Sequence, residues 1–127
     1  MIEFRSVRKT FADASGKETV ALHGLDLRIE PGVVHCLIGT SGCGKTTSLR
    51  LVNRLEQPTS GQVLVDGEDV RTADVIELRR RIGYVIQSGG LFPHLTVAKN
   101  VGVLCELEGH GAKDVKERVD TLLAIPL

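Results

Sequence analysis

Two stretches near the start of the chain alternate between apolar and polar residues. In residues 2–7, and again in residues 20–29, apolar side chains fall at roughly every second position. This period is typical of a β-strand with one buried face. The segment between them, residues 9–18, is polar and contains Gly16, so it predicts a loop or hairpin.

Two later stretches are apolar almost without interruption. Residues 33–38 read Val-Val-His-Cys-Leu-Ile, and residues 82–86 read Ile-Gly-Tyr-Val-Ile. Such runs are typical of strands that are buried on both faces, as in a parallel sheet. The pattern therefore predicts two such strands in addition to the two alternating ones.

A period of 3.6 residues follows the first of these runs. In residues 45–56 it brings Leu49, Val52 and Leu55 onto one helical face, and Pro58 bars continuation of the helix. A short strand is expected at residues 63–65, before an Asp66-Gly67 turn.

Two further helices have recognisable starts, and a last one has an apolar stripe. Asp74 and Glu77 have the spacing of a capping box and open a short helix that ends near residue 81. Thr96 is expected to cap a helix that runs to about residue 107. The stripe that predicts the last helix consists of Val115, Val119, Leu122 and Leu123.

Length and composition narrow the class of protein. A chain of 127 residues is one small domain or a piece of a larger one. Sixteen Lys and Arg residues balance sixteen Asp and Glu residues, which argues against a nucleic-acid partner because such binding needs a basic surplus. No apolar run approaches the roughly 20 residues of a membrane span. Three cysteines without paired spacing indicate a reducing compartment, and we expect the cytoplasm.

One motif predicts specific chemistry. Residues 39–46 match the pattern G-x-x-x-x-G-K-[ST], in which glycines allow successive backbone amides to point at phosphate oxygens. The amino terminus of the following helix adds its unpaired amides and its positive dipole end. An ordinary glycine-rich turn is the alternative, but the apolar run before the motif and the amphipathic helix after it favour a phosphate loop. The expected nucleotide-binding residues are Gly39, Thr40, Ser41, Gly42, Cys43, Gly44, Lys45, Thr46 and Thr47.

Two side chains of this motif and the threonine that follows it have distinct expected roles. Lys45 supplies a positive charge for the outer phosphates, and the Thr46 hydroxyl is suited to bind Mg²⁺. Thr47 adds a further hydroxyl. The motif therefore predicts a bound polyphosphate with Mg²⁺, and the resemblance given next implies that the nucleotide is ATP.

The wider sequence resembles the ATP-binding subunit of an ABC transporter, most closely those of importers for osmoprotectant quaternary amines such as glycine betaine or choline. Relatives that import other small polar solutes differ by few residues here. The resemblance implies an α/β P-loop NTPase fold, with an antiparallel β subdomain and an incomplete parallel α/β core. The segments that carry it are Asn53-Arg54-Leu55, Pro58-Thr59-Ser60-Gly61, Asp66-Gly67, Leu78-Arg79-Arg80-Arg81-Ile82-Gly83-Tyr84-Val85-Ile86-Gln87 and Leu91-Phe92-Pro93-His94-Leu95-Thr96-Val97.

The resemblance also implies roles outside the phosphate loop. Gln87 would be the Q-loop glutamine, which reaches Mg²⁺ and the attacking water. Phe11 falls near the family's adenine-stacking aromatic, and a side chain of the hairpin without that role is the alternative. Residues 91–97 would face the coupling helix of a transmembrane permease, although Leu91, Phe92 and Leu95 could instead pack in a core. A second ATPase subunit and, indirectly, a solute-binding protein are the other implied partners, at the inner face of the cell membrane.

Two of the family's motifs do not occur in these 127 residues: the Leu-Ser-Gly-Gly-Gln signature and a Walker B strand that ends in Asp-Glu. Residues 1–127 are therefore expected to be the amino-terminal part of an ABC ATP-binding domain, before both motifs. Alone they should show negligible ATPase activity, because the Walker B carboxylates that polarise the attacking water are missing. The leading function is coupling of ATP binding and hydrolysis to solute uptake. The alternative is a nucleotide-binding or permease-binding module without turnover.

Overall fold

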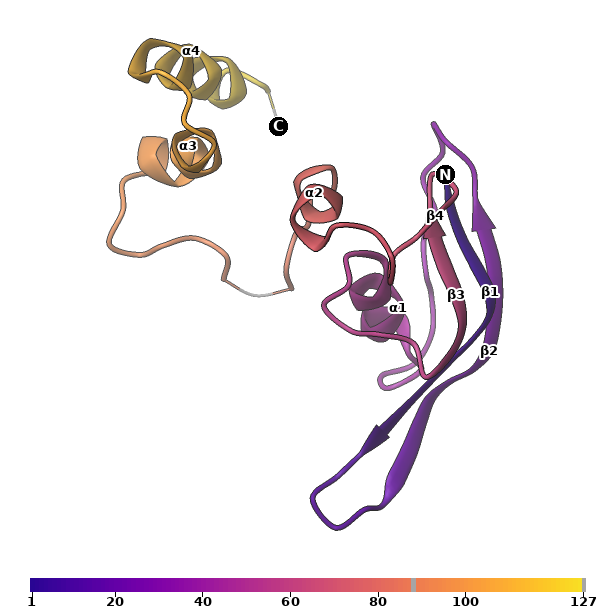
Figure 1. Cartoon of the computed structure of the whole chain (residues 1–127). Helices are drawn as coiled ribbons and strands as arrows, with labels where there is room; N and C mark the ends of the chain where they lie inside the picture. The colour runs from indigo at the N-terminus through magenta and orange to yellow at the C-terminus, as the bar shows by residue number, and fades with distance from the viewer. Residues whose placement is uncertain (88, 127) are drawn as a thin grey trace. The chain divides into compact units, whose positions relative to one another are not determined.

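Antiparallel pairing organises the strands of the chain. The computed structural model describes residues 1–87 and 89–126, and these divide into two units, Met1–Gly83 and a second that begins at Tyr84. The described strands form one sheet in the order β2-β1-β3-β4, which Figure 1 shows in the first unit. Their bounds are β1 Ile2–Ala12, β2 Glu18–Ile29, β3 Ser60–Val65 and β4 Glu68–Asp69.

The hairpin of β1 and β2 is longer than the sequence predicted. Strand pairing continues through Phe11, which lies opposite Thr19, so of the loop or hairpin expected at residues 9–18 the hairpin is confirmed, with a tight connection. Polar side chains are tolerated there because this end of the hairpin reaches beyond β3, whose pairing with β1 ends at Arg8. Asp13 closes the connection by accepting hydrogen bonds from the amides of Ser15 and Lys17.

Helix α1 (Lys45–Val52) packs on one face of the sheet (Figure 1). Its buried residues are Ser48, Leu51 and Val52, whereas Leu49 is 53% exposed. The expected apolar stripe was therefore wrong in part. Val52 is buried as predicted, but Leu49 lies on the exposed side of the helix, and Leu55 lies outside the helix because α1 ends at Val52. The core cluster consists of Phe4, Val7, Leu22, Leu51, Val52, Val63, Val65, Val70, Ala73 and Leu78.

Helix α2 (Val75–Arg80) closes the first unit and confirms the Asp74 half of the predicted capping box, whereas the Glu77 carboxylate pairs with Arg80. The Asp74 carboxylate accepts hydrogen bonds from the amides of Ile76 and Glu77. Arg79 donates to the carbonyls of Asn53 and Arg54, just beyond the carboxyl end of α1. The two helices are therefore tied by side-chain to main-chain hydrogen bonds as well as by the core.

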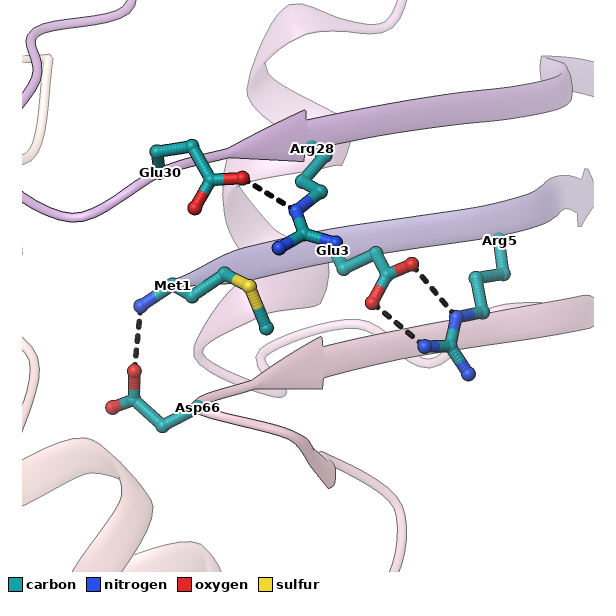
Figure 2. Close-up of polar contacts among 6 residues, drawn as sticks. All are labelled: Met1, Glu3, Arg5, Arg28, Glu30 and Asp66. Atoms are coloured by element: carbon teal, nitrogen blue, oxygen red, sulfur yellow. Dashed lines mark hydrogen bonds and ion pairs between the residues drawn. The ribbon is translucent and has the colours of Figure 1, made fainter.

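The opposite face of the sheet is charged. Figure 2 shows the Arg5 guanidinium binding both carboxylate oxygens of Glu3, with Arg28 on the neighbouring strand paired to Glu30. The adjacent Arg5 lowers the pKa of the Glu3 carboxyl below its usual range. Such exposed pairs contribute little to stability, so they chiefly keep this face soluble.

The two apolar runs do not form the predicted strands. Residues 33–40 and 82–86 have no regular secondary structure, and the side chains of Val34, Ile38 and Val85 are more than nine-tenths exposed. A strand that is buried on both faces requires neighbouring strands and covering helices, and the described strands form only the antiparallel sheet. The apolar pattern of these two runs therefore predicts burial that the described residues do not provide.

The second unit contains a helical hairpin of α3 (Val97–Leu107) and α4 (Ala112–Leu123). Thr96 caps α3 as predicted, accepting a hydrogen bond from the amide of Lys99. Gly102 is buried against Val115 and Val119 of α4, whereas Leu122 and Leu123 of the predicted stripe are exposed. None of the helices in the described part of the chain has the length and apolar character needed to cross a membrane.

Candidate functional site

Gly44 seats the glycine-rich loop against the sheet. It is the N-cap residue of α1, with a φ of 95° that favours glycine. A Cβ atom added there would lie 2.7 Å from the carbonyl oxygen of Ala21 and 2.7 Å from a methyl carbon of Leu22. Only a residue without a side chain allows α1 to start this close to β2.

Lys45, the first residue of α1, turns back onto the loop that precedes it. Its Nζ atom donates to the carbonyl oxygens of Gly39 at 2.8 Å and Thr40 at 2.7 Å. The Sγ atom of Cys43 lies 3.4 Å from the same nitrogen. The ammonium group of Lys45, a half-buried residue, therefore lies directly beside the main chain of the loop.

The main-chain amides at the start of α1 are available to a ligand. The cap residue offers no side-chain hydrogen bond, and the first turn contains no acidic residue. Five main-chain amides in this stretch donate no hydrogen bond to any residue that the structure describes. They are those of Gly42, Gly44, Lys45, Thr46 and Thr47. Unpaired amides at a helix amino terminus, next to an ammonium group, form a donor set for an anion.

Two hydroxyl groups extend this donor set. Thr46 is exposed and Thr47 is half-buried, and both follow Lys45 in the first turn of α1. Ser48, one position further, is buried and donates instead to the Gly44 carbonyl at 3.0 Å. The amides, ammonium and hydroxyls fit a polyphosphate with a hard cation, because a hydroxyl oxygen is a ligand that Mg²⁺ accepts.

The predicted aromatic residue lies on the long hairpin. The Phe11 ring is 38% exposed, and the Nζ atom of Lys9 lies 4.6 Å from the ring centroid. Lys9 is also paired with Glu56, with an Nζ to Oε2 distance of 3.0 Å. Phe11 is therefore a strand residue with one ring face against a cation, and its role toward adenine stays a prediction.

Gln87 belongs to the second unit, whereas the glycine-rich loop belongs to the first. It is exposed and lies outside regular structure, so the strand expected to precede it is absent there. Its assignment as a nucleotide sensor continues to depend on the sequence alone.

Sequence reasoning missed Asn100. This residue lies in the first turns of α3, and its side-chain amide contacts the main chain of residues 92–96 at both ends. The only signal in the sequence is an amide four residues after the predicted cap Thr96, which by itself does not distinguish Asn100 from any exposed helical residue.

Comparison with solved structures defines the class of protein. The dimeric structure of a bacterial ABC transporter cassette is 34% identical, with a TM-score of 0.83 over 97% of this chain and 54% of that one. A dimeric ATP-binding cassette in a post-hydrolysis state with ADP and Pi is 31% identical, with a TM-score of 0.81 over 94% of this chain and 54% of that one. The fold is that of the ATP-binding cassette, and the antiparallel sheet with its helices represents part of it.

The sequence identifies the family directly. The chain belongs to the ABC transporter family, whose pattern it matches over residues 22–125. The glycine betaine/carnitine/choline transport ATP-binding protein OpuCA of Bacillus subtilis is 42% identical over 98% of this chain and 32% of its own length. The glycine betaine uptake system ATP-binding protein YehX of Escherichia coli is also 42% identical, over 98% of this chain and 39% of its own length.

Relatives named for another solute match as well. The methionine import ATP-binding protein MetN of Xanthomonas oryzae is 46% identical over 98% of this chain and 38% of its own length. The chain thus spans between about a third and two fifths of the length of these curated relatives.

Proposed function

We propose that this chain is the nucleotide-binding, amino-terminal part of the ATP-binding subunit of an ABC importer. The observation that carries the proposal is the donor set at the start of α1, where free amides and the Lys45 ammonium gather with no carboxylate in the first turn. Relatives named as transport ATP-binding proteins, matched over nearly the whole chain, support it.

Each group in the loop has a defined task in this proposal. The amides of Gly42 and of residues 44–47 orient the phosphates, and Lys45 neutralises charge on the outer ones. Thr46 contributes its hydroxyl to Mg²⁺, with Gln87 as the second proposed metal contact. Phe11 stacks on the base. When bound, Mg·ATP supplies the phosphoanhydride bond whose hydrolysis drives the transporter.

The proposed cargo is an osmoprotectant quaternary amine. The proposed partner is a transmembrane permease, which the ATP-binding subunit would contact at the inner face of the cell membrane. Relatives named for glycine betaine, carnitine and choline support the cargo. The exposed apolar residues Leu91, Phe92 and Val97 support a contact with the permease, whereas Leu95 of the predicted patch is half-buried. A second ATP-binding subunit is the remaining proposed partner, since the similar cassettes are dimeric.

Uptake by cells tests the proposal. Cells that lack their own betaine, choline and methionine importers would receive the complete gene with its neighbouring transport genes. We expect uptake of labelled glycine betaine or choline, abolished by Lys45→Ala, whereas methionine uptake stays at background. Methionine uptake alone would reject the cargo but keep the ATP-dependent importer, and uptake that is insensitive to Lys45→Ala would reject the nucleotide role.

The second candidate is a module that binds nucleotide or permease without turnover. What supports it is the donor set at the start of α1, which can bind a nucleotide whether or not hydrolysis follows. Binding of Mg·ATP to the 127-residue chain without phosphate release, in a folded sample, is expected under both candidates. Phosphate release that Lys45→Ala abolishes would reject the module.

A further inference from the structure

We propose that Asn100 is a positioning residue, which holds residues 91–96 in the shape that the membrane subunit recognises. The inference rests on the proposed function, in which residues 91–97 contact the permease. It goes beyond that function by assigning the shape of this contact surface to one side chain that is not itself part of it.

The Asn100 amide is saturated by the main chain of this segment. Its Oδ1 atom accepts a hydrogen bond from the Phe92 amide at 2.7 Å. Its Nδ2 atom, which carries two hydrogens, shares them among the carbonyl oxygens of Phe92 at 3.1 Å, Leu95 at 3.1 Å and Thr96 at 3.0 Å. An amide is the side-chain group that can accept at one end and donate at the other, so the segment wraps around a single two-ended group.

These bonds leave the side chains of Leu91 and Phe92 exposed, while Leu95 is half-buried. Leu91 is 74% exposed and Phe92 is 48% exposed, while the main chain of Phe92 is bound at both its amide and its carbonyl. The Leu95 amide adds a turn by donating to the Phe92 carbonyl at 3.0 Å. The Phe92 ring also meets the His94 ring edge-on, with 6.0 Å between the ring centroids. The segment thus presents apolar side chains on an ordered main chain, without burying them.

Order of this kind raises affinity for a partner. A free loop must lose conformational entropy when it binds, and a loop that is already ordered loses less. Since one side chain makes four of the bonds that order this segment, we expect its loss to weaken docking although it does not touch the permease.

Aspartate at position 100 separates positioning from helix stability. Asn100 is the fourth residue of α3, where a carboxylate interacts favourably with the helix dipole. The same carboxylate cannot donate, and it would face the carbonyl oxygens of Phe92, Leu95 and Thr96. If Asn100 only stabilised α3, Asn100→Asp would be neutral or stabilising, whereas a positioning role predicts a loss of docking.

The experiment uses the complete ATP-binding subunit and its purified permease in detergent or nanodiscs. The variants are Asn100→Asp, Asn100→Ala, Leu91→Asp as a direct test of the surface, and Lys99→Ala as the matched control on the neighbouring helical position. For each, the Kd for the permease, the Kd for Mg·ATP and the thermal unfolding midpoint would be measured. Transport into vesicles gives the coupled activity.

We expect Asn100→Asp and Asn100→Ala to weaken permease binding roughly tenfold or more, the effect of losing one or two hydrogen bonds that preorganise the surface. The Kd for Mg·ATP should change less than about twofold, and Lys99→Ala should behave as wild type. If the Asn100→Asp protein binds the permease as tightly as wild type while the Leu91→Asp protein binds it more weakly, the positioning role alone would be overturned. Wild-type binding of the Leu91→Asp protein would overturn the docking surface and this inference with it.

Discussion

The Nζ atom of Lys45, the first residue of α1, lies 2.7 Å from the carbonyl oxygen of Thr40, five residues earlier in the glycine-rich loop. The ammonium group that is proposed to neutralise the phosphates therefore lies beside the main chain of the loop, at the helix end where the free amides of α1 also lie. This arrangement concentrates positive potential at one helix end without any carboxylate to offset it in the first turn.

Lys45→Ala should weaken Mg·ATP binding by roughly 10- to 100-fold, because a hydrogen bond to a charged group is worth about 1.5–3 kcal/mol. Isothermal titration of the complete subunit gives the two Kd values. Arg50→Ala is the matched control, since it removes one positive charge from the other end of α1. An equal loss in both variants would mean that net charge, rather than the position of Lys45, governs binding.

Gly44→Ala should destabilise the first unit more than Gly42→Ala. Both residues have positive φ, 95° and 81°, so both variants incur about 1–2 kcal/mol of backbone strain. Only at Gly44 would the new Cβ overlap the Ala21 carbonyl and Leu22, which adds about 1–3 kcal/mol. Urea unfolding compares the two, and equal free energies of unfolding would show that contact with β2 is unimportant.

Gly102 permits the close approach of α3 and α4. A Cβ there would lie 2.9 Å from Val115 Cγ1 and 3.2 Å from Val119 Cγ2. Gly102→Ala should therefore be destabilising by up to about 2 kcal/mol, although alanine is the better helix former by about 1 kcal/mol. Adding Val115→Ala should recover part of that loss, with a coupling energy of about 1 kcal/mol in a double-mutant cycle. Strict additivity would contradict the proposed contact.

The Asp74 cap should make stability depend on pH in the acid range. Hydrogen bonds from the amides of Glu77 and Ile76 lower the pKa of the Asp74 carboxyl below its usual range. Because the folded pKa is below the unfolded value of about 3.9, the stabilisation is present above that value and is lost as pH falls through the folded pKa. Asp74→Asn keeps an acceptor but removes the titration.

The stability difference between wild type and Asp74→Asn should therefore be constant from neutral pH to about pH 5 and shrink below about pH 4. Thermal unfolding as a function of pH gives this difference, and an NMR titration gives the Asp74 midpoint directly. A midpoint at or above the ordinary aspartate value would contradict the role of the two amide bonds.

Modification of Cys43 should block the site. The thiol is exposed, and its Sγ atom lies 3.4 Å from the Nζ atom of Lys45, so a bulky adduct would occupy the space beside the ammonium. In a background with Cys36→Ser and Cys105→Ser, maleimide treatment should abolish Mg·ATP binding, and bound nucleotide should slow the reaction. Unchanged Kd after complete modification of Cys43 would contradict this geometry.

Local signals in the sequence predicted the local structure well. Asp74 and Thr96 begin helices at the predicted positions, since a cap needs only amides two or three residues away. The phosphate-loop motif likewise predicted where α1 begins, because glycine and lysine spacing acts within eight residues. The resemblance to the family, which the comparisons confirm, depended on several such short segments together.

Contacts between residues far apart along the chain could not be predicted from the apolar and polar pattern of the sequence. The run at residues 33–38 is apolar enough for a buried strand, yet Val34 and Ile38 are exposed, because burial depends on neighbours that the described strands do not provide. The extension of β1 to Ala12 was missed because pairing with β2, and not alternation, maintains it.

Residues close together along the chain were enough to predict the start of α1 after the glycine-rich loop, the helix caps and the family. Tertiary structure alone decided that Gly44 touches β2, that Leu51 rather than Leu49 is buried, and that the Asn100 amide orders the segment before α3. The physical reason is that these contacts depend on how a helix is rotated and where a chain returns in space, which no periodicity encodes.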